Sequence, residues 1–389
     1  MTPAARVAAA IEVVESILDG QATEPALLQW ARGSRYAGSK DRAAVRDLVF
    51  EARRKWASSR AIGGADTGRA VILGLLAQTG ADIPALFSGA GYGPAERTED
   101  EAARSLEAVD LSVAERVDMP DWLWARLDAQ YGAQAEEIAL SLRDRAEVFL
   151  RVNLARSTRE AAMEALGAAG IMTEPHALAQ SALKVTAGAR QIRQSTAYQS
   201  GLVELQDAAS QALVDALEVT SGQSVLDYCA GGGGKALGLA ANGARVTAHD
   251  ISGARMADLP VRAERAEVEI ALHTPDDLDP EARFDLVLCD APCSGSGAWR
   301  RSPDGKWNLT EADLAEVTRT QLEVLQTAQK FVKPDGRLAY ATCSILEAEN
   351  DDTVASFVQA RPEWQRAKRA VWLPSTGGDG FFLQVLERA

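Results

Sequence analysis

The sequence has little cysteine and no long apolar run. Its four cysteines all lie in the C-terminal half of the 389-residue chain: Cys229, Cys289, Cys293 and Cys343. They lack the C-x-x-C or Cys/His spacing of a zinc site, and their irregular spacing is not that of a disulfide framework. No apolar stretch approaches the roughly 20 residues that cross a bilayer. We therefore expect no metal, no disulfide and no membrane partner.

Positive charge is scarce too, since the formal net charge is −14. Phosphate contacts come from Lys and Arg, so any nucleic acid would have to be bound by local basic patches. One patch is predicted in a helix and one in a loop, and their residues are Lys40, Arg42, Arg46, Arg53, Arg54 and Lys55, and Arg300, Arg301 and Lys306. A solvated helix face is the alternative interpretation of the first group.

The N-terminal segment is interrupted by Arg6, Glu12 and Glu15 at helical spacing. This pattern indicates an amphipathic helix that Thr2 can cap, and not a signal peptide. We therefore expect a cytoplasmic protein. No feature of the sequence indicates an obligate oligomer, and we expect a monomer.

The first half of the chain predicts two small domains. Residues 1–90 are expected to be all-helical, because apolar positions recur at helical spacing from Val45 to Trp56 and again from Gly68 to Gln78. Residues 91–118 are predicted to be a linker, since Gly, Pro and acidic residues replace the periodic pattern there. Residues 119–203 predict a small α+β domain, with an alternating strand at 148–153.

Residues 204–389 alternate between strand and helix patterns. Strands are expected at 224–229, 245–249, 268–272, 284–290, 337–342 and 381–386, with helical stretches such as 322–332 between them. Alternation of this kind predicts an α/β fold with a doubly wound, mostly parallel sheet. Such sheets bind ligands at the carboxyl ends of their strands, and the three motifs of this region each follow a strand.

The first motif is a glycine loop between a strand and a helix. Its candidate cofactor-binding residues are Asp227, Cys229, Ala230, Gly231, Gly232, Gly233, Gly234 and Lys235. Glycines let the backbone approach a ligand closely, and Asp250 at the end of the next strand can accept hydrogen bonds from an adenosine ribose. A dinucleotide or S-adenosylmethionine fits this pairing. The absence of a G-x-G-x-x-G pattern favours S-adenosylmethionine.

The other two motifs each carry a cysteine followed by a serine. Asp290-Ala-Pro-Cys293-Ser follows one predicted strand, and Thr342-Cys343-Ser follows another. Two thiols at one edge of a sheet are not the usual filling of a hydrophobic core, whereas Cys289, inside a strand, fits that role. A thiolate is a strong nucleophile, so the pair indicates covalent catalysis.

With these motifs the chain resembles the RsmB/Nop/Sun family of RNA (cytosine-5) methyltransferases, and its bacterial 16S ribosomal RNA branch most. The resemblance is carried by "RVNLARSTREAAMEALGAAGI" from Arg151, "VELQDAASQ" from Val203, "FDLVLCDAPCSGSGAWRRSPDGKW", "LAYATCSILEAEN" and "DGFFLQVLER". "DRAAVRDLVFEARR" from Asp41 is similar to the NusB-like RNA-binding domain of the ribosomal members.

The resemblance implies an enzyme with a Rossmann-like methyltransferase domain, S-adenosylmethionine as cofactor and ribosomal RNA as partner. Cys343 matches the nucleophile that adds to carbon 6 of the cytosine, which activates carbon 5 toward the methyl group. Cys293 matches the cysteine that helps release the product, and Asp290 matches a residue between cofactor and base. Lys235 and Asp250 match cofactor-site positions.

The chain departs from this family in its cofactor loop. Gly231 and Gly232 replace the family's Ala-Pro, and Ala236 replaces a hydroxyl residue, so we expect a more flexible loop. The acidic residue expected after the third strand is assigned to Asp277. The alternatives are a transfer-RNA cytosine-5 methyltransferase, a non-catalytic RNA-binding protein of ribosome assembly, and an oxidoreductase with a dinucleotide site.

Overall fold

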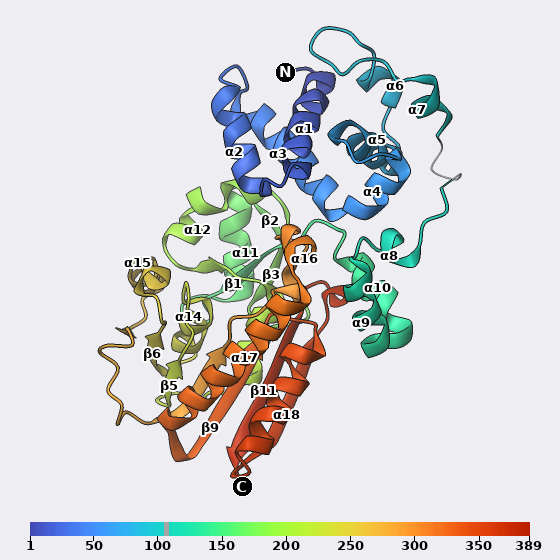
Figure 1. Ribbon diagram of the computed structural model, residues 1–389. Coiled ribbons are helices and arrows are strands. Elements are labelled where there is room, and N and C mark those ends of the chain that lie inside the picture. The colour runs from blue at the N-terminus through green and yellow to red at the C-terminus, as the bar shows by residue number, and fades with distance from the viewer. Residues whose placement is uncertain (105–108) are drawn as a thin grey trace. The chain divides into compact units, whose positions relative to one another are not determined.

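The contacts of the chain divide it into two units in the computed structural model, which describes residues 1–104 and 109–389 (Figure 1). The helical unit comprises Met1–Arg145 and Trp299–Asn308, and the α/β unit comprises Ala146–Ala298 and Leu309–Ala389. Residues 105–108 of the predicted linker lie outside the described residues. The domain boundaries at residues 90, 118 and 203 stay a prediction.

The helical unit begins with five helices that share one core. They are α1 (Pro3–Leu18), α2 (Thr23–Gly33), α3 (Ser39–Arg54), α4 (Trp56–Gly63) and α5 (Gly68–Thr79). The Thr2 hydroxyl caps α1 as predicted, accepting a hydrogen bond from the Ala5 N–H. Val45 and Val49 of α3 pack with Val71 and Leu75 of α5, so the helical spacing found in the sequence is the buried face.

Shorter helices complete this unit. They are α6 (Ile83–Leu86), α7 (Glu99–Ala103), α8 (Val113–Arg116), α9 (Asp121–Tyr131), α10 (Ala135–Ser141) and α16 (Asp304–Asn308). Two of them, α7 and α8, lie in the stretch predicted to be a linker, and each begins with a capping box. Among the described helices of the whole chain, none is long and apolar enough to cross a membrane.

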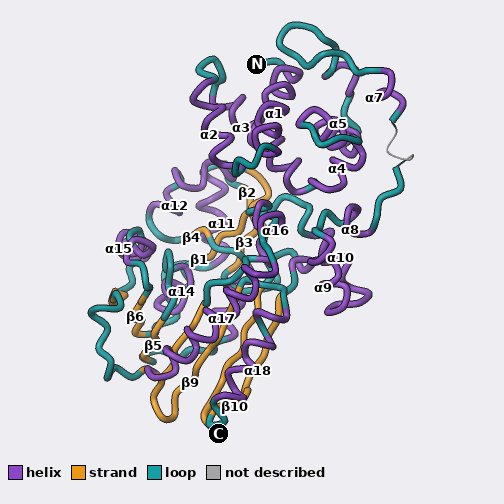
Figure 2. The backbone as a smooth tube through the Cα atoms, in the orientation of Figure 1, coloured by secondary structure: helices purple, strands orange, loops and turns teal. Residues whose placement is uncertain are grey.

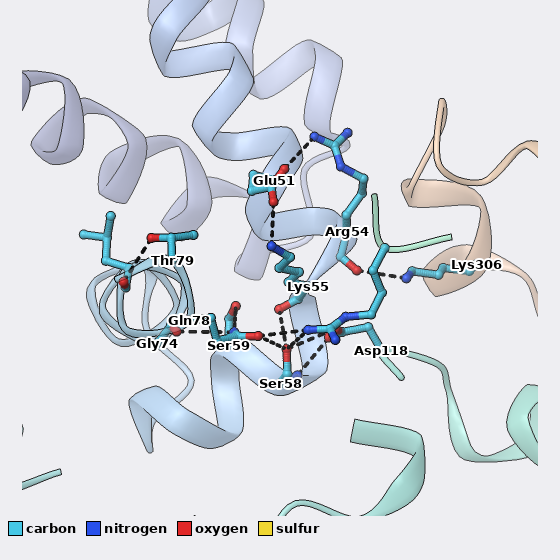
Figure 3. Close-up of polar contacts among 12 residues, drawn as sticks. Glu51, Arg54, Lys55, Ser58, Ser59, Gly74, Gln78, Thr79, Asp118 and Lys306 are labelled. Atoms are coloured by element: carbon cyan, nitrogen blue, oxygen red, sulfur yellow. Dashed lines mark hydrogen bonds and ion pairs between the residues drawn. The ribbon is translucent and has the colours of Figure 1, made fainter. Parts of the chain in front are cut away.

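Lys306, on α16, lies inside a polar cluster of the helical unit, which Figure 3 shows. Its side chain is fully buried and its Nζ donates to the Arg54 carbonyl at 3.0 Å. The buried carboxylate of Asp118 accepts from Ser58 and forms an ion pair with Arg143 at 2.6 Å. Burial, partly opposed by the charge of Asp118, lowers the pKa of Lys306 to about 7.

The structure corrects the two predicted basic patches in part, since Lys40, Arg42, Arg46 and Arg301 are exposed and four other members are not. Arg53, Arg54, Arg300 and Lys306 are buried, so they cannot present charge to an RNA backbone. Arg53 instead forms an ion pair with Asp304 at 2.7 Å. The sequence pattern was misleading because a cation that binds an internal carboxylate or carbonyl has the same residue type as one that faces solvent.

The α/β unit begins with a four-stranded antiparallel sheet of order β2-β3-β1-β4. Its elements are β1 (Val148–Val152), α11 (Arg159–Ala168), β2 (Met172–Pro175), β3 (Ala182–Ala187), α12 (Thr196–Gln199) and β4 (Val203–Leu205). Leu150, Val152 and Leu183 pack against Ala162 and Leu166 of α11. This part forms the small α+β fold that the sequence predicts.

The larger sheet has seven strands in the order β10-β11-β9-β8-β5-β6-β7 (Figure 2). Its strands are β5 (Ser224–Asp227), β6 (Arg245–His249), β7 (Ile270–His273), β8 (Phe284–Asp290), β9 (Val332–Thr342), β10 (Trp364–Trp372) and β11 (Phe381–Arg388). From β7 to β9 all neighbours are parallel, and β10 and β11 join antiparallel. The predicted doubly wound, mostly parallel sheet is confirmed.

Helices cover both faces of this sheet. On one face lie α13 (Ala208–Ala216), α14 (Gly234–Ala241) and α15 (Leu259–Ala266), and on the other lie α17 (Glu311–Ala328) and α18 (Asp351–Ala360). Successive residues of a strand serve opposite faces: Leu286 and Leu288 pack in the first layer, and Val287 and Cys289 in the second. Cys289 is fully buried, as expected.

Strand β10 was not predicted from the sequence. It is an edge strand whose side chains alternate between partly covered and exposed, and it carries Arg366, Lys368 and Arg369. Charged residues discourage pairing at a free sheet edge, which is why the strand has no apolar pattern to reveal it.

Candidate active site

The three motifs of the α/β unit meet at the carboxyl ends of four adjacent parallel strands. The chain runs from β5 outward to β6 and β7, then crosses back to β8 on the opposite side of β5. Such a switch point opens a crevice, because the loops after the two central strands leave in opposite directions. The glycine loop follows β5, Asp250 follows β6, and the two cysteine motifs follow β8 and β9.

The glycine loop depends on the conformational freedom of two of its residues. Gly231 and Gly233 have φ values of +51° and +76°. A Cβ on Gly233 would also lie 2.3 Å from the side chain of Leu259 on α15. Glycine is required there for conformation and for space.

Side chains from three directions fix the loop. Asp250, which is buried, accepts from the Gly231 N–H at 3.0 Å. Arg262 of α15 donates to the Gly232 carbonyl, and buried Arg151 of β1 donates to the Gly234 carbonyl at 2.8 Å. The loop therefore has defined contacts although four consecutive glycines give it little stiffness of its own.

A cavity of about 790 Å³ opens beside this loop. Its lining comes from the segments that follow β5, β6, β7 and β8 and from α17, and it includes Tyr228, Cys229, Gly231, Gly232, His249, Asp250, Ile251, Pro275, Asp290 and Cys293. The Ile251 side chain is 81% exposed, and the Tyr228 and His249 rings stack with centroids 4.5 Å apart. A pocket of this size, with apolar walls and a few carboxylates that include Asp250 and Asp290, suits a nucleoside.

Lys235, which is buried, forms an ion pair at 2.7 Å with Asp290, which lines the cavity. Burial by itself lowers the pKa of Lys235, but the charge of Asp290 and their hydrogen bond outweigh it and raise the pKa. Nearby, Asp227 is buried, and its Oδ1 has no hydrogen-bond partner among the residues that the structure describes. Burial, followed by the charge of Asp290, raises the Asp227 pKa to about 7.

The sulfur atoms of Cys293 and Cys343 lie 3.3 Å apart, although 50 positions separate the residues in the chain. Both cysteines are free and half-buried. The hydrogen bond to Cys343 and then burial raise the pKa of Cys293 well above the ordinary value. The two thiols thus form a hydrogen-bonded pair at the edge of the cavity, in which either sulfur can be the donor.

The structure brings together all the predicted site residues except Asp277. The loop residues, Asp250, Asp290 and Cys293 line or border the cavity, and Cys343 adjoins it through Cys293. The Asp277 carboxylate is instead exposed and accepts from the N–H and hydroxyl of Thr274 in its own turn. A side chain within a short turn bonds locally, and a cofactor role for Asp277 stays a prediction.

Sequence reasoning missed Glu349 in this region. Its fully buried carboxylate accepts hydrogen bonds from the serine after each cysteine, Ser294 and Ser344. The only signal available was the repeated Cys-Ser pair, which did not indicate its partner.

Two family models match the chain. Residues 214–383 match the 16S rRNA methyltransferase RsmB/F model, and residues 119–191 match the ferredoxin-like domain of RsmF/B-like methyltransferases. Ribosomal RNA small subunit methyltransferase B of Yersinia pseudotuberculosis is 34% identical over 278 residues, which are 68% of this chain. That match spans 65% of the relative's length.

Solved structures share the fold, and two of them illustrate the likeness. One is the protein PH0851, with a TM-score of 0.75 at 21% identity over 100% of this chain and 99% of that one. The other is NSun6 from Pyrococcus horikoshii with SFG, with a TM-score of 0.60 at 17% identity over 69% and 98%. At these identities the likeness concerns the fold.

Proposed function

With its residues 119–191 and 214–383 the chain belongs to the RsmB/F family of methyltransferases, and on this premise we propose that it methylates carbon 5 of a cytosine in 16S ribosomal RNA through a covalent adduct with Cys343. The observation that carries the proposal is the thiol pair, whose sulfur atoms lie 3.3 Å apart at the edge of a nucleoside-sized cavity.

S-adenosylmethionine is the cofactor of this family, and it supplies the methyl group from a sulfonium. The residues present fit it. Asp250 reaches the cavity beside the glycine backbone and can accept from ribose hydroxyls, and exposed Ile251 offers an apolar surface for a base. Asp290, Cys293 and the loop share this cavity, so a bound methyl donor and the thiol pair would be neighbours.

In the proposed reaction the Cys343 thiolate forms a bond to carbon 6 of the cytosine. The π electrons of the 5,6 bond then become available at carbon 5, which would bond to the methyl group as the methyl–sulfur bond breaks and its electron pair stays on sulfur in a neutral thioether. Asp290 supports this step from the cavity wall by hydrogen bonding to the ring, and its ion pair with Lys235 keeps both charges in place. Transfer of the carbon 5 proton to water and departure of the Cys343 thiolate from carbon 6 restore the double bond, and Cys293 assists the release.

The test uses tritiated S-adenosylmethionine and undermethylated bacterial ribosomal RNA, resolved on a denaturing gel. Wild type should label the RNA, Cys343→Ala should give no product, and Cys293→Ala should give a slowly migrating protein–RNA adduct. Cys289→Ala is the matched control, because this cysteine belongs to the core and should leave adduct formation unchanged.

Labelling of RNA by Cys343→Ala at the wild-type rate would refute the proposed nucleophile. Labelling of transfer RNA in place of ribosomal RNA would refute the substrate but keep the chemistry. No labelling, together with no cofactor binding by calorimetry, would indicate a non-catalytic RNA-binding protein.

A further inference from the structure

Glu349 joins the two cysteine turns through one buried side chain. It ends the 3₁₀ turn Glu347–Glu349, and its side chain is fully buried. Oε1 accepts from the Ser294 N–H at 2.7 Å and from Gln321 Nε2 at 3.0 Å. Oε2 accepts from the hydroxyls of Ser294 and Ser344, the residues that directly follow Cys293 and Cys343.

These contacts indicate that Glu349 is ionised. Four donors reach its two oxygens, and a carboxyl that accepts at every position has no need of a proton of its own. Within the described part of the chain Glu349 forms no ion pair, so neutral N–H and O–H groups alone stabilise its charge. Such a charge is poorly screened and acts strongly on its surroundings.

The charges around the thiol pair are distributed unevenly. Lys235 of α14 contributes a positive charge that interacts with Cys343, alongside its partner Asp290 of β8 and Asp227 of β5. The negative charge of Glu349 acts on Cys293: after the hydrogen bond to Cys343 and burial, it is a further cause that raises the pKa of that thiol.

We infer that Glu349 is a positioning residue that makes Cys293 the donor of the sulfur–sulfur hydrogen bond, so that Cys343 is the thiol free to act as the nucleophilic thiolate. Its hydrogen bonds hold the two Cys-Ser turns together, and its charge opposes ionisation of Cys293. The value of this arrangement for catalysis rests on the proposed function, since a nucleophile must be ionised before it attacks. The proton assignment itself is a property of the free protein.

The test therefore uses the full-length protein without RNA or cofactor. Brief iodoacetamide labelling across a pH series, followed by peptide mass spectrometry, gives the rates at Cys343 and Cys293. Wild type should be labelled faster at Cys343, with buried Cys289 as an unreactive internal reference. Glu349→Gln keeps the shape but removes the charge, and the Cys343:Cys293 rate ratio should fall about tenfold, the effect of one pKa unit.

Tyr340→Phe is the matched control. The Tyr340 hydroxyl donates to the backbone carbonyl of Glu349 at 2.6 Å, so its loss weakens the same turn without removing the carboxylate. This variant should have a lower melting temperature and keep the wild-type rate ratio. A role of Glu349 that is only structural would instead change the ratio equally in both variants.

An unchanged ratio in folded Glu349→Gln would overturn the inference. If that variant does not fold, the wild type alone decides, because labelling of Cys293 as fast as Cys343 would exclude the proposed proton assignment. A wild-type ratio in favour of Cys343 combined with no methyl transfer to any RNA would leave the assignment standing and refute the proposed function.

Discussion

Replacing Lys306 by methionine should change how the stability of the protein depends on pH. This lysine is fully buried and its pKa is lowered to about 7, first by burial, whereas its ordinary value is 10.5. At a pH between these two pKa values, the Lys306 side chain carries a proton in the unfolded chain but not in the folded chain. Stability must therefore rise with pH across this window, and the lysine is unfavourable when charged at lower pH.

The magnitude follows from the two pKa values. One proton of difference changes the free energy of unfolding by about 1.36 kcal/mol per pH unit. Between pH 7 and pH 9, with partial ionisation at the lower end, Lys306 should contribute about 2 kcal/mol of added stability. Lys306→Met lacks this contribution. The free energy of unfolding of the wild type minus that of the variant should therefore increase by that amount from pH 7 to pH 9.

Urea denaturation at pH 7, 8 and 9 measures this difference. Lys40→Met, which removes an exposed lysine of the same unit, is the control and should follow the wild type at every pH. Parallel curves for Lys306→Met and wild type would refute the reasoning, because they would show that Lys306 keeps the same charge in the folded and unfolded states.

Three further predictions concern the glycine loop. Arg262→Ala removes the donor to the Gly232 carbonyl and should weaken cofactor binding about tenfold by calorimetry, since binding must then order a freer loop. Asp250→Ala should weaken it at least about tenfold, because the Gly231 N–H loses its acceptor and the ribose loses a partner. Gly233→Ala should lower stability by about 1–3 kcal/mol by thermal denaturation, because the new Cβ meets Leu259 at a positive φ.

Local patterns in the sequence were sufficient for the fold of the α/β unit except for strand β10. Successive residues of a strand pack into the two buried layers on opposite faces of the sheet, as Leu286 and Val287 of β8 illustrate. Strands buried on both faces are short apolar runs, which can be recognised in the sequence. The glycine loop, Asp250 and both cysteine motifs each follow a strand, so their common edge could be inferred from the parallel order. Edge strand β10 was not predicted, because most of its residues are polar and exposed.

Charge burial was the part that the sequence did not reveal. Lys306 and Arg53 have the composition of an RNA-binding patch, yet both are buried in the helical unit. Glu349 carries no local signal either, since its partners Ser294 and Gln321 lie 55 and 28 positions away. Whether a charged side chain faces water or an internal partner depends on segments that meet only after folding.

The sequence by itself determined the alternation of elements, the loop that needs glycine and the residue types of the site, because these depend on neighbours along the chain. Only the tertiary structure decided that the Cys293 and Cys343 sulfurs lie 3.3 Å apart, and that Glu349 joins their turns. Distances between residues on different strands depend on strand order and register. These arise from packing of the whole sheet, which no single segment encodes.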